Sequence, residues 1–503
     1  MRLLLLLLAG LCLPGAQPLR FRITLSASVA PQGASGRLFV FLDKGSEAVE
    51  RIKVGFLPES VWLAAKEVPY WKAGDTVELN PDEMAFPQGF SKAAKGDYVV
   101  MALLDRDHTF ARERQDAGDL TSAVTVLKAF DPADAAPVAL ELSAVTPARA
   151  ATPDTEQVKY VRFESPRLSA FFGRPIYMQA GVVVPKGHTA DGPALPTVYH
   201  IHGFGGNYRE AFAKGERITA AIEAREAFRA VHVFLDGNCP GGHHVFADSV
   251  NNGPWGAALT EELIPHLEKR FHLAPLAAGR FVTGHSSGGW SSLWLQVRYP
   301  DFFGGTWSTS PDSMDFRSFT GIDVTPGSTQ NAYRTKAGAA LNLVRMQGKD
   351  VMSVEEFARM EVVTGEYGGQ LASFDWVFSP RGADGRPMPV FNRETGALDQ
   401  AVLPYWQKYE IARIVRDNWA ELGPKLRGKI RLTIGSMDNF HLNEAATMFC
   451  GWLAEKGREE ACEIVPERDH FDLHRPYKTY PNGLTKRMDD EMRAQWEKRN
   501  QPR

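Results

Sequence analysis

The chain has 503 residues, 57 Lys and Arg against 60 Asp and Glu, and a formal net charge of -3. This length predicts two or three domains with ample material for a large core. A composition of 44% hydrophobic and 23% charged residues is that of a globular protein and excludes wholesale disorder, a collagen-like fibre and a long coiled coil. The near-neutral balance argues against nucleic acid as a partner, because phosphate binding leaves a strongly basic footprint.

The N-terminus has the pattern of a secretory signal peptide over residues 1–16. Arg2 precedes an apolar stretch, residues 3–13, which small residues follow. The stretch is short for a membrane span, which takes roughly 20 residues, although a short membrane anchor is the alternative. No later stretch is apolar enough to span a membrane. We therefore expect a soluble mature protein that is secreted or periplasmic.

Cysteines are sparse. Beyond the leader the chain has Cys239, Cys450 and Cys462, which form neither a disulfide framework nor a zinc-binding spacing. Cys450 and Cys462 could pair if the turn at Gly457 folds back, or they could remain two buried thiols. The sequence leaves these alternatives open.

Residues 19–130 predict a small β-sandwich. Phe21, Ile23 and Leu25 alternate with polar residues, and further short apolar runs follow with Gly, Pro, Asp and Asn between them. Residues 131–155 contain two Pro- and Ala-rich stretches and predict a linker.

Residues 156–503 have a different rhythm, in which short apolar strands alternate with amphipathic segments. Strands are predicted at 158–163, 176–184, 197–201, 231–235, 280–283, 305–307, 429–434 and 462–465. Leu259, Leu263 and Leu267 form one helical stripe, and residues 290–297 carry another. The pattern predicts a mainly parallel sheet covered on both faces.

The alternation of strands and helices stops between residues 311 and 422, where Gly, Pro and Asp turns and several aromatic residues occur. An insertion of this size after a parallel strand predicts a cap or lid over the carboxyl ends of the strands. A separate helical domain is the alternative.

The most informative motif is Gly284-His285-Ser286-Ser287-Gly288. It lies between a predicted strand and an amphipathic helix, as a G-x-S-x-G nucleophile turn requires. Such a turn would expose the hydroxyl of Ser286 and place the amide of Ser287 at a helix N-terminus, where the dipole favours a developing oxyanion. An ordinary turn that caps the helix is the alternative.

A second motif, His202-Gly203-Phe204-Gly205-Gly206, follows the strand 197–201. A Gly-rich turn there lets backbone amides approach a substrate carbonyl oxygen, and Phe204 N–H is the preferred donor, with Gly205 next. His200 and His202 could instead bind a metal, but no matching acidic and histidine pattern follows them. We therefore expect no metal.

A serine nucleophile requires a base that an acid orients. Asp438 follows the late strand 429–434 and is the candidate acid, unless it only caps the next helix. His470 follows the strand 462–465 and is the candidate base, with His474 as its competitor. His441 lies beside the acid and is expected to support it.

These residues together resemble the putative-esterase family of α/β-hydrolases, the group that contains S-formylglutathione hydrolase, feruloyl esterases and the mycolyltransferases. The resemblance runs from Val158 to the C-terminus, apart from the insertion. It also includes Asp236-Gly237 and the segment 261–265. It implies an α/β-hydrolase fold with a large cap insertion, preceded by a small N-terminal β-sandwich domain.

The resemblance also implies Ser286 as nucleophile, His470 as base and Asp438 as acid, with the amides of Phe204 and Ser287 as the oxyanion hole. It implies no cofactor. Because the insertion and the N-terminal domain exceed the minimal family enzyme, the resemblance does not identify the substrate.

Three further residues are candidates for substrate binding. Asn252 and Trp255 precede the helix 256–271 at the ligand-binding end of the sheet, and with Trp376 they could form an aromatic wall for a sugar or a phenolic group. Aromatic residues that pack the cap are the alternative.

The sequence therefore favours an exported serine esterase that acts on a small-molecule or glycan-linked ester. An acyltransferase or a serine peptidase on the same scaffold is the second hypothesis. A non-catalytic binding protein that keeps the fold is the third. The sequence does not predict the oligomeric state.

Overall fold

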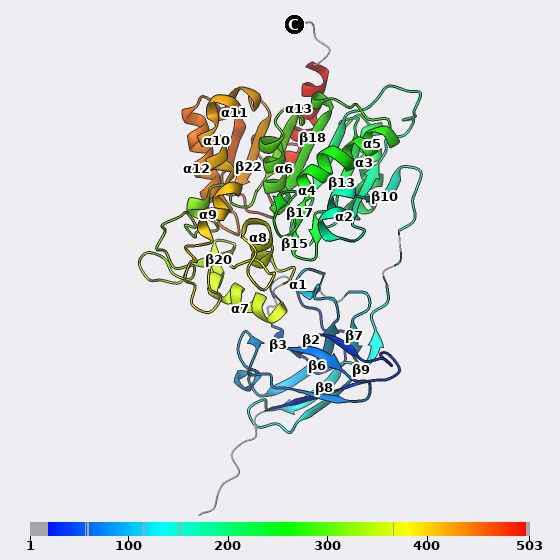
Figure 1. Ribbon diagram of the computed structural model, residues 1–503, viewed down its shortest axis with the longest axis vertical. Helices are drawn as coiled ribbons and strands as arrows, with labels where there is room; N and C mark the ends of the chain where they lie inside the picture. The colour runs from blue at the N-terminus through cyan, green and yellow to red at the C-terminus, as the bar shows by residue number, and fades with distance from the viewer. Residues whose placement is uncertain are drawn as a thin grey trace, which may run out of the picture. The chain divides into compact units, whose positions relative to one another are not determined.

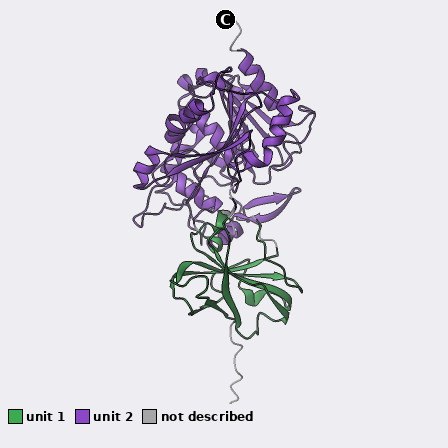
Figure 2. Ribbon diagram, turned by 90° about the vertical axis from the view of Figure 1, so that its right-hand side faces the viewer, with its two compact units in different colours: residues 1–149, 363–365 green, residues 150–362, 366–503 purple. Residues whose placement is uncertain are grey.

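The computed structural model describes residues 19–498, apart from residues 56, 58–59, 114–115, 149, 151 and 366. The predicted signal peptide therefore lies outside the described residues. The chain divides into two compact units (Figures 1 and 2). Unit 1 contains residues 1–149 and 363–365, and unit 2 contains residues 150–362 and 366–503.

Unit 1 is built on one nine-stranded sheet in the order β4-β1-β9-β7-β6-β2-β3-β5, in which β8 also pairs with β6. The strands are β1 (Phe21–Leu25), β2 (Ala34–Lys44), β3 (Trp62–Trp71), β4 (Thr76–Leu79), β5 (Ala85–Phe86), β6 (Gly96–Asp105), β7 (Leu120–Ser122), β8 (Thr125–Phe130) and β9 (Val138–Val145). A short helix, α1 (Phe110–Glu113), follows β6.

The sheet of unit 1 branches at β6, where β7 pairs near one end and β8 near the other. Both arms bury alternate residues in one core. Phe21, Ile23 and Leu25 come from β1, and Leu38 and Val40 come from β2. The two arms of the sheet thus form a sandwich-like arrangement, because every second side chain of each strand points into the same core.

The predicted linker over residues 131–155 is wrong in its middle. Residues 138–145 form β9, which pairs parallel with β1 and antiparallel with β7. Leu140 and Leu142 point into the core, while Glu141 is exposed. The alternation is that of an ordinary strand, but the Pro- and Ala-rich composition on both sides obscured it.

Unit 2 contains an eight-stranded sheet in the order β10-β11-β13-β12-β18-β19-β22-β23. Its strands are β10 (Val158–Glu164), β11 (Tyr177–Val183), β12 (Thr197–Ile201), β13 (Val231–Leu235), β18 (Arg280–His285), β19 (Gly305–Thr309), β22 (Ile430–Gly435) and β23 (Cys462–Val465). β11 pairs antiparallel with both of its neighbours, and the six strands from β13 to β23 in this order are parallel. This order is that of an α/β-hydrolase, so the predicted fold class is confirmed.

Helices cover both faces of this sheet (Figure 1). They are α2 (Pro166–Phe172), α3 (Glu210–Glu223), α4 (Trp255–Ala258), α5 (Ile264–Arg270), α6 (Ser287–Arg298), α12 (Leu442–Glu455) and α13 (Leu484–Lys498). The stripe of Leu259, Leu263 and Leu267 packs on one face with Tyr199, while α13 packs on the other with Val198. Adjacent residues of β12 thus enter different cores, as expected for a strand buried on both faces.

The residues between β19 and β22 form the predicted insertion. It contains a hairpin, β20 (Asn342–Met346) and β21 (Lys349–Ser353), and the helices α7 (Val354–Thr364), α8 (Gln370–Phe378), α9 (Leu403–Trp406), α10 (Ile411–Asp417) and α11 (Trp419–Lys425). Four two-residue strands lie between β13 and α4, namely β14 (Asn238–Cys239), β15 (Gly242–His243), β16 (Asp248–Ser249) and β17 (Gly253–Pro254).

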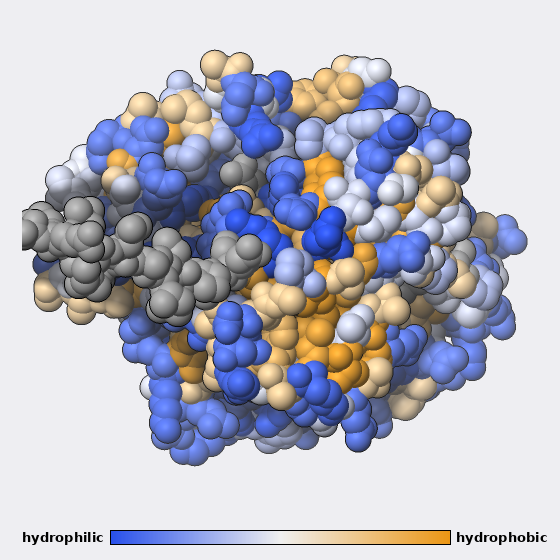
Figure 3. All heavy atoms as spheres, turned by 90° about the horizontal axis from the view of Figure 1, so that it is seen from below, coloured by the Kyte–Doolittle hydropathy of each residue, from blue (hydrophilic) through white to orange (hydrophobic). Residues whose placement is uncertain are grey.

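The surface mixes polar and apolar side chains. On the face drawn in Figure 3, hydrophobic residues gather near the middle and hydrophilic residues surround them. Large hydrophobic residues exposed in unit 1 are Val49, Tyr70 and Val145. Within the residues that the structure describes, no helix combines the length and the apolar character that a membrane span needs.

Cys450 of α12 and Cys462 of β23 form a disulfide with a Cα–Cα distance of 5.7 Å. Gly457, at φ +67°, makes the turn that brings them together. The alternative of two free thiols is therefore excluded for this structure, and Cys239 is a buried cysteine outside any disulfide of the described residues.

We predict that replacing Cys450 and Cys462 together by serine lowers the free energy of unfolding by about 3 kcal/mol, because the crosslink restricts a loop of this length in the unfolded chain. Urea unfolding of the purified protein without reductant measures the change. Cys239→Ala in the same assay is the matched control, and dithiothreitol should destabilise the wild type but not the double variant. An unchanged midpoint in the double variant would contradict the prediction.

Candidate active site

Ser286 lies between β18 and α6 in an unusual backbone conformation. Its φ is 59° and its ψ is -125°, whereas helical geometry begins at Ser287. A non-glycine residue at positive φ is strained, and such strain persists only where the surroundings enforce it. The same conformation presents the serine side chain at the end of the strand and places the amide of Ser287 in the first turn of the helix.

Close backbone packing enforces this turn. A Cβ atom at Gly284 would lie 2.2 Å from Gly288 O, and one at Gly288 would lie 2.0 Å from Ile201 O. Only glycine fits at either position, because real Cβ atoms do not approach oxygen so closely. The two glycines of the motif thus let the turn pack directly against the end of β12.

The second motif adjoins the first. Gly206 N–H donates to Gly203 O at 3.1 Å and closes a turn in which Gly205 has φ +79°. A Cβ atom at Gly203 would lie 3.3 Å from the Cβ of Ser286. Phe204, the predicted oxyanion donor, therefore sits in a turn that packs against the candidate nucleophile.

Histidines around this turn have structural partners. Gly237 N–H donates to His202 Nε2 at 2.8 Å, so the proton of His202 lies on Nδ1 and is donated to Gly203 O. His243 Nε2 donates to His202 O at 3.0 Å. His200 Nε2 lies 2.9 Å from His232 Nδ1. His200 and His202 are thus engaged in separate contacts, and the buried His243 supports the backbone of His202.

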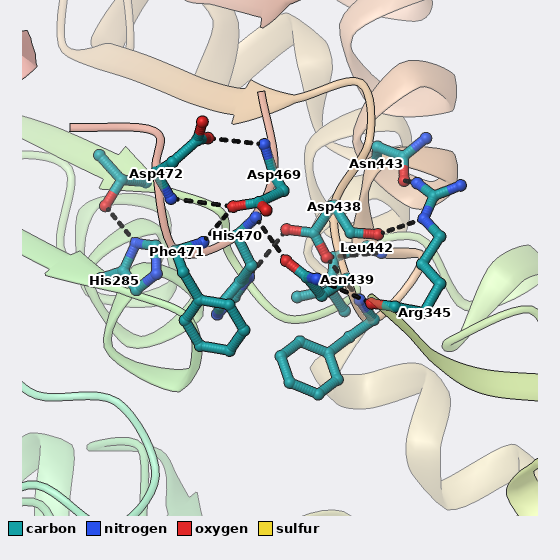
Figure 4. A network of polar contacts seen from close by, with 12 residues as sticks. His285, Arg345, Asp438, Asn439, Leu442, Asn443, Asp469, His470, Phe471 and Asp472 are labelled. Atoms are coloured by element: carbon teal, nitrogen blue, oxygen red, sulfur yellow. Dashed lines mark hydrogen bonds and ion pairs between the residues drawn. The ribbon is translucent and has the colours of Figure 1, made fainter. Parts of the chain in front are cut away.

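The candidate acid and base are in contact (Figure 4). His470 Nδ1 lies 2.8 Å from Asp438 Oδ2, and both side chains are buried, with 4% and 0% of the side chain exposed. Asp438 follows β22 and His470 follows β23, whose parallel pairing brings the two loops to the same sheet edge. Phe440 N–H donates to the other oxygen, Asp438 Oδ1, at 3.0 Å.

His474, the competing base, also lies near His285, with ring centroids 5.7 Å apart, but it does not contact the acid. Its Nδ1 is 3.2 Å from Thr485 Oγ1, and burial lowers its pKa to about 4. His441 immediately precedes α12 beside the acid, and its N–H donates to Asp438 O at 3.3 Å. Of the two histidines after β23, the structure thus pairs His470 with the acid.

The link from the base to the serine is indirect in this structure. The imidazoles of His285 and His470 have ring centroids 4.4 Å apart, which places His470 against the residue that precedes Ser286. Among the described residues, no hydrogen bond joins Ser286 Oγ to His470. Such bonds are often long before substrate binds, so the geometry is compatible with proton transfer between them.

The sequence reasoning also missed a second carboxylate, Asp312, which follows β19. Ser287 Oγ donates to Asp312 Oδ2 at 2.7 Å, and Asp312 N–H donates to Ser286 O at 3.3 Å. Gln370 of α8 donates to Ser287 Oγ at 3.4 Å. Burial raises the pKa of Asp312 from 3.8 to about 6, although the hydrogen bond from Ser287 opposes this rise.

Two of the three residues predicted for the aromatic wall, Trp255 and Asn252, are buried. Trp255 is 5% exposed, stacks on His244 with ring centroids 3.8 Å apart, and donates from Nε1 to Asn252 O at 2.7 Å. Asn252 is 3% exposed. Both residues are therefore buried, and Asn252 and Trp376 lie on the same side of Gly241, where an added Cβ would be 3.0 and 2.7 Å from their side chains. Trp376 lines a cavity of about 280 Å³ within the insertion, together with Tyr367 and Arg386.

The segment that contains both glycine-rich motifs also matches a known family. Residues 172–355 match the family model described as putative esterase. No curated protein matches the chain.

Among solved structures, a ferulic acid esterase is 12% identical with a TM-score of 0.42, and the match covers 68% of this chain and 99% of that one. The S-formylglutathione hydrolase of Staphylococcus aureus is 12% identical with a TM-score of 0.38, covering 67% and 98%. A ferulic acid esterase of Anaeromyces mucronatus is 13% identical with a TM-score of 0.36, covering 69% and 95%.

We predict that Asp312→Asn stabilises the protein at pH 8 and not at pH 4. The carboxyl of Asp312 ionises less readily in the folded chain than in the unfolded chain, so its ionisation costs folding up to about 3 kcal/mol above pH 6. That cost disappears as pH falls below about 4, where both states are protonated. Melting temperatures of the two proteins between pH 4 and pH 8 test this, and a difference that does not grow with pH would contradict it.

Unit 2 thus has the strand order of the α/β-hydrolase fold and the strained serine turn, and residues 172–355 are similar to the putative-esterase family.

Proposed function

We propose that the protein hydrolyses carboxylic esters through an acyl-enzyme on Ser286. The observation that carries this proposal is the strained turn at Ser286, against which both the Gly203–Gly206 turn and the loop of His470 pack. The His470–Asp438 contact supports it, because a serine hydroxyl becomes an effective nucleophile only beside an oriented base.

In the first step, His470 Nε2 takes the proton of Ser286 Oγ as Oγ bonds to the ester carbonyl carbon. The carbonyl oxygen becomes an oxyanion, which the amides of Phe204 and Ser287 would stabilise. The intermediate collapses, the bond to the alcohol oxygen breaks, and His470 gives its proton to that oxygen. In the second step, His470 takes a proton from water as the water oxygen bonds to the acyl carbon. The bond to Ser286 Oγ then breaks, His470 returns the proton to Oγ, and the carboxylic acid leaves.

Asp438 holds His470 in the tautomer that this chemistry requires. Because Asp438 Oδ2 is 2.8 Å from Nδ1, the proton of neutral His470 sits on Nδ1, and Nε2 keeps the lone pair that takes the serine proton. The imidazolium that forms in the transition state lies beside a buried carboxylate, where charge pairing is stronger than in water.

We also propose that the protein is exported. The apolar leader at residues 3–13 and the disulfide between Cys450 and Cys462 support this, since disulfides persist in oxidising compartments. The substrate that fits this proposal is a small-molecule or glycan-linked ester.

We expect a fluorophosphonate probe to label the wild-type protein and not Ser286→Ala, because the probe reacts with an activated serine. Turnover of p-nitrophenyl acetate should fall by roughly a thousandfold or more in Ser286→Ala and in His470→Ala. His474→Ala is the matched control, since His474 contacts Thr485 rather than the acid, and it should retain labelling and turnover.

Loss of turnover in His474→Ala with retention in His470→Ala would reverse the assignment of the base. A folded wild-type protein that neither reacts with the probe nor turns over the ester would contradict the proposed function. Adding an alcohol distinguishes hydrolysis from acyl transfer, because a transferase would form the new ester in place of acetate.

A further inference from the structure

The insertion contacts the loop of the candidate acid through the hairpin β20–β21 (Figure 4). Arg345 lies on β20, and its backbone N–H donates to Asn439 O at 2.9 Å. Its side chain reaches the same loop, where Nε donates to Asp438 O at 2.8 Å and Nη2 donates to Ser436 O at 3.3 Å. One residue of the insertion thus binds three backbone carbonyls of a single turn.

The shape of the guanidinium explains why arginine occupies this position. Its planar fork presents several donors in fixed directions, so one side chain can satisfy carbonyls that converge from successive residues. Nη2 also donates to Asn443 Oδ1 at 3.1 Å, which ties the turn to the first residues of α12. Lysine, with a single nitrogen, could not make these contacts at once.

The hairpin is also connected to the candidate base. Asn439 Nδ2 donates to Arg345 O at 2.7 Å, and Asn439 Oδ1 accepts from His470 N–H at 2.9 Å. Asn439 is 1% exposed. A buried amide therefore joins the insertion to the backbone of His470, while Arg345 joins it to the backbone of Asp438.

The carboxylate of Asp438 depends on this turn for its direction. Phe440 N–H donates to Oδ1 at 3.0 Å, and Leu442 N–H lies 3.4 Å from the same oxygen. The other oxygen, Oδ2, faces His470. Because the amides and the carboxylate belong to one turn, a shift of its backbone would move the carboxylate away from the imidazole.

We propose that Arg345 is a positioning residue for the acid–base pair, supplied by the insertion rather than by the α/β-hydrolase sheet. It holds the turn 436–439 so that Asp438 meets His470, and it makes the hairpin a part of the catalytic apparatus. The inference rests on the proposed function, since it names a residue that supports the same reaction.

The test compares Arg345→Met and Arg345→Lys with the wild type in p-nitrophenyl acetate turnover. Arg345→Met removes the donors but keeps the apolar stem, and we expect kcat to fall between about tenfold and a hundredfold, with KM changed less than about threefold. Arg345→Lys should recover part of the loss, because its ammonium can still donate to one carbonyl. Arg334→Met is the matched control, since Arg334 pairs with Glu355 inside the insertion.

A double-mutant cycle with Asp438→Asn separates positioning from a general structural role. If Arg345 acts through Asp438, Arg345→Met should change kcat by less than about twofold in the Asp438→Asn background. An equal loss in both backgrounds, or wild-type kcat in folded Arg345→Met, would overturn the inference. If Arg345→Met does not fold, the same cycle run with Arg345→Lys decides the question.

The results that would refute the role of Arg345 differ from the results that would refute the proposed function. If Ser286→Ala kept full turnover, the reaction itself would be assigned wrongly. If Ser286→Ala and Asp438→Asn both lost turnover while Arg345→Met did not, only the role of Arg345 would be refuted.

Discussion

The contact between His470 Nδ1 and Asp438 Oδ2 is the interaction on which the candidate site depends. A carboxylate as fully buried as Asp438 is costly unless hydrogen bonds satisfy it. The amide of Phe440 binds one of its oxygens, and His470 binds the other. The same contact fixes the tautomer of His470. One hydrogen bond therefore both satisfies the buried carboxylate and prepares the histidine to act as a base.

The sheet sets the positions of the other parts of the candidate site. Parallel pairing of β12, β18, β19, β22 and β23 brings five loops to the same edge, where each contributes one part of the site. Glycine at positions 284 and 288 lets two of these loops approach more closely than any side chain would allow. The strain at Ser286 is therefore imposed by close backbone packing around the turn.

Much of unit 2 was predictable because its signals are local. Short apolar runs between turns located the strands of the sheet, and the spacing of glycines around Ser286 located its turn. The errors have local causes as well. β9 was hidden by its Pro- and Ala-rich flanks, and Trp255, a candidate for the aromatic wall, stacks its indole on His244 in the core.

Contacts that join distant segments had no sequence signal. Arg345 reaches Asp438 across 93 residues, and Ser287 reaches Asp312 across 25. Neither Arg345 nor Asp312 belongs to a motif, because each is defined by a partner that the fold brings near. The insertion therefore contributes to the candidate site, since it supplies both Arg345, which contacts Asp438, and Gln370, which contacts Ser287.

The central claim is that Ser286 forms the covalent intermediate, and the adjacent Ser287 makes the claim open to a sharp test. The most direct measurement is peptide mapping by mass spectrometry of the adduct formed with a fluorophosphonate. We expect one equivalent of label per chain, with fragment ions that place it on Ser286. Label on Ser287 or on a residue outside the turn, in active protein, would contradict this account of the site.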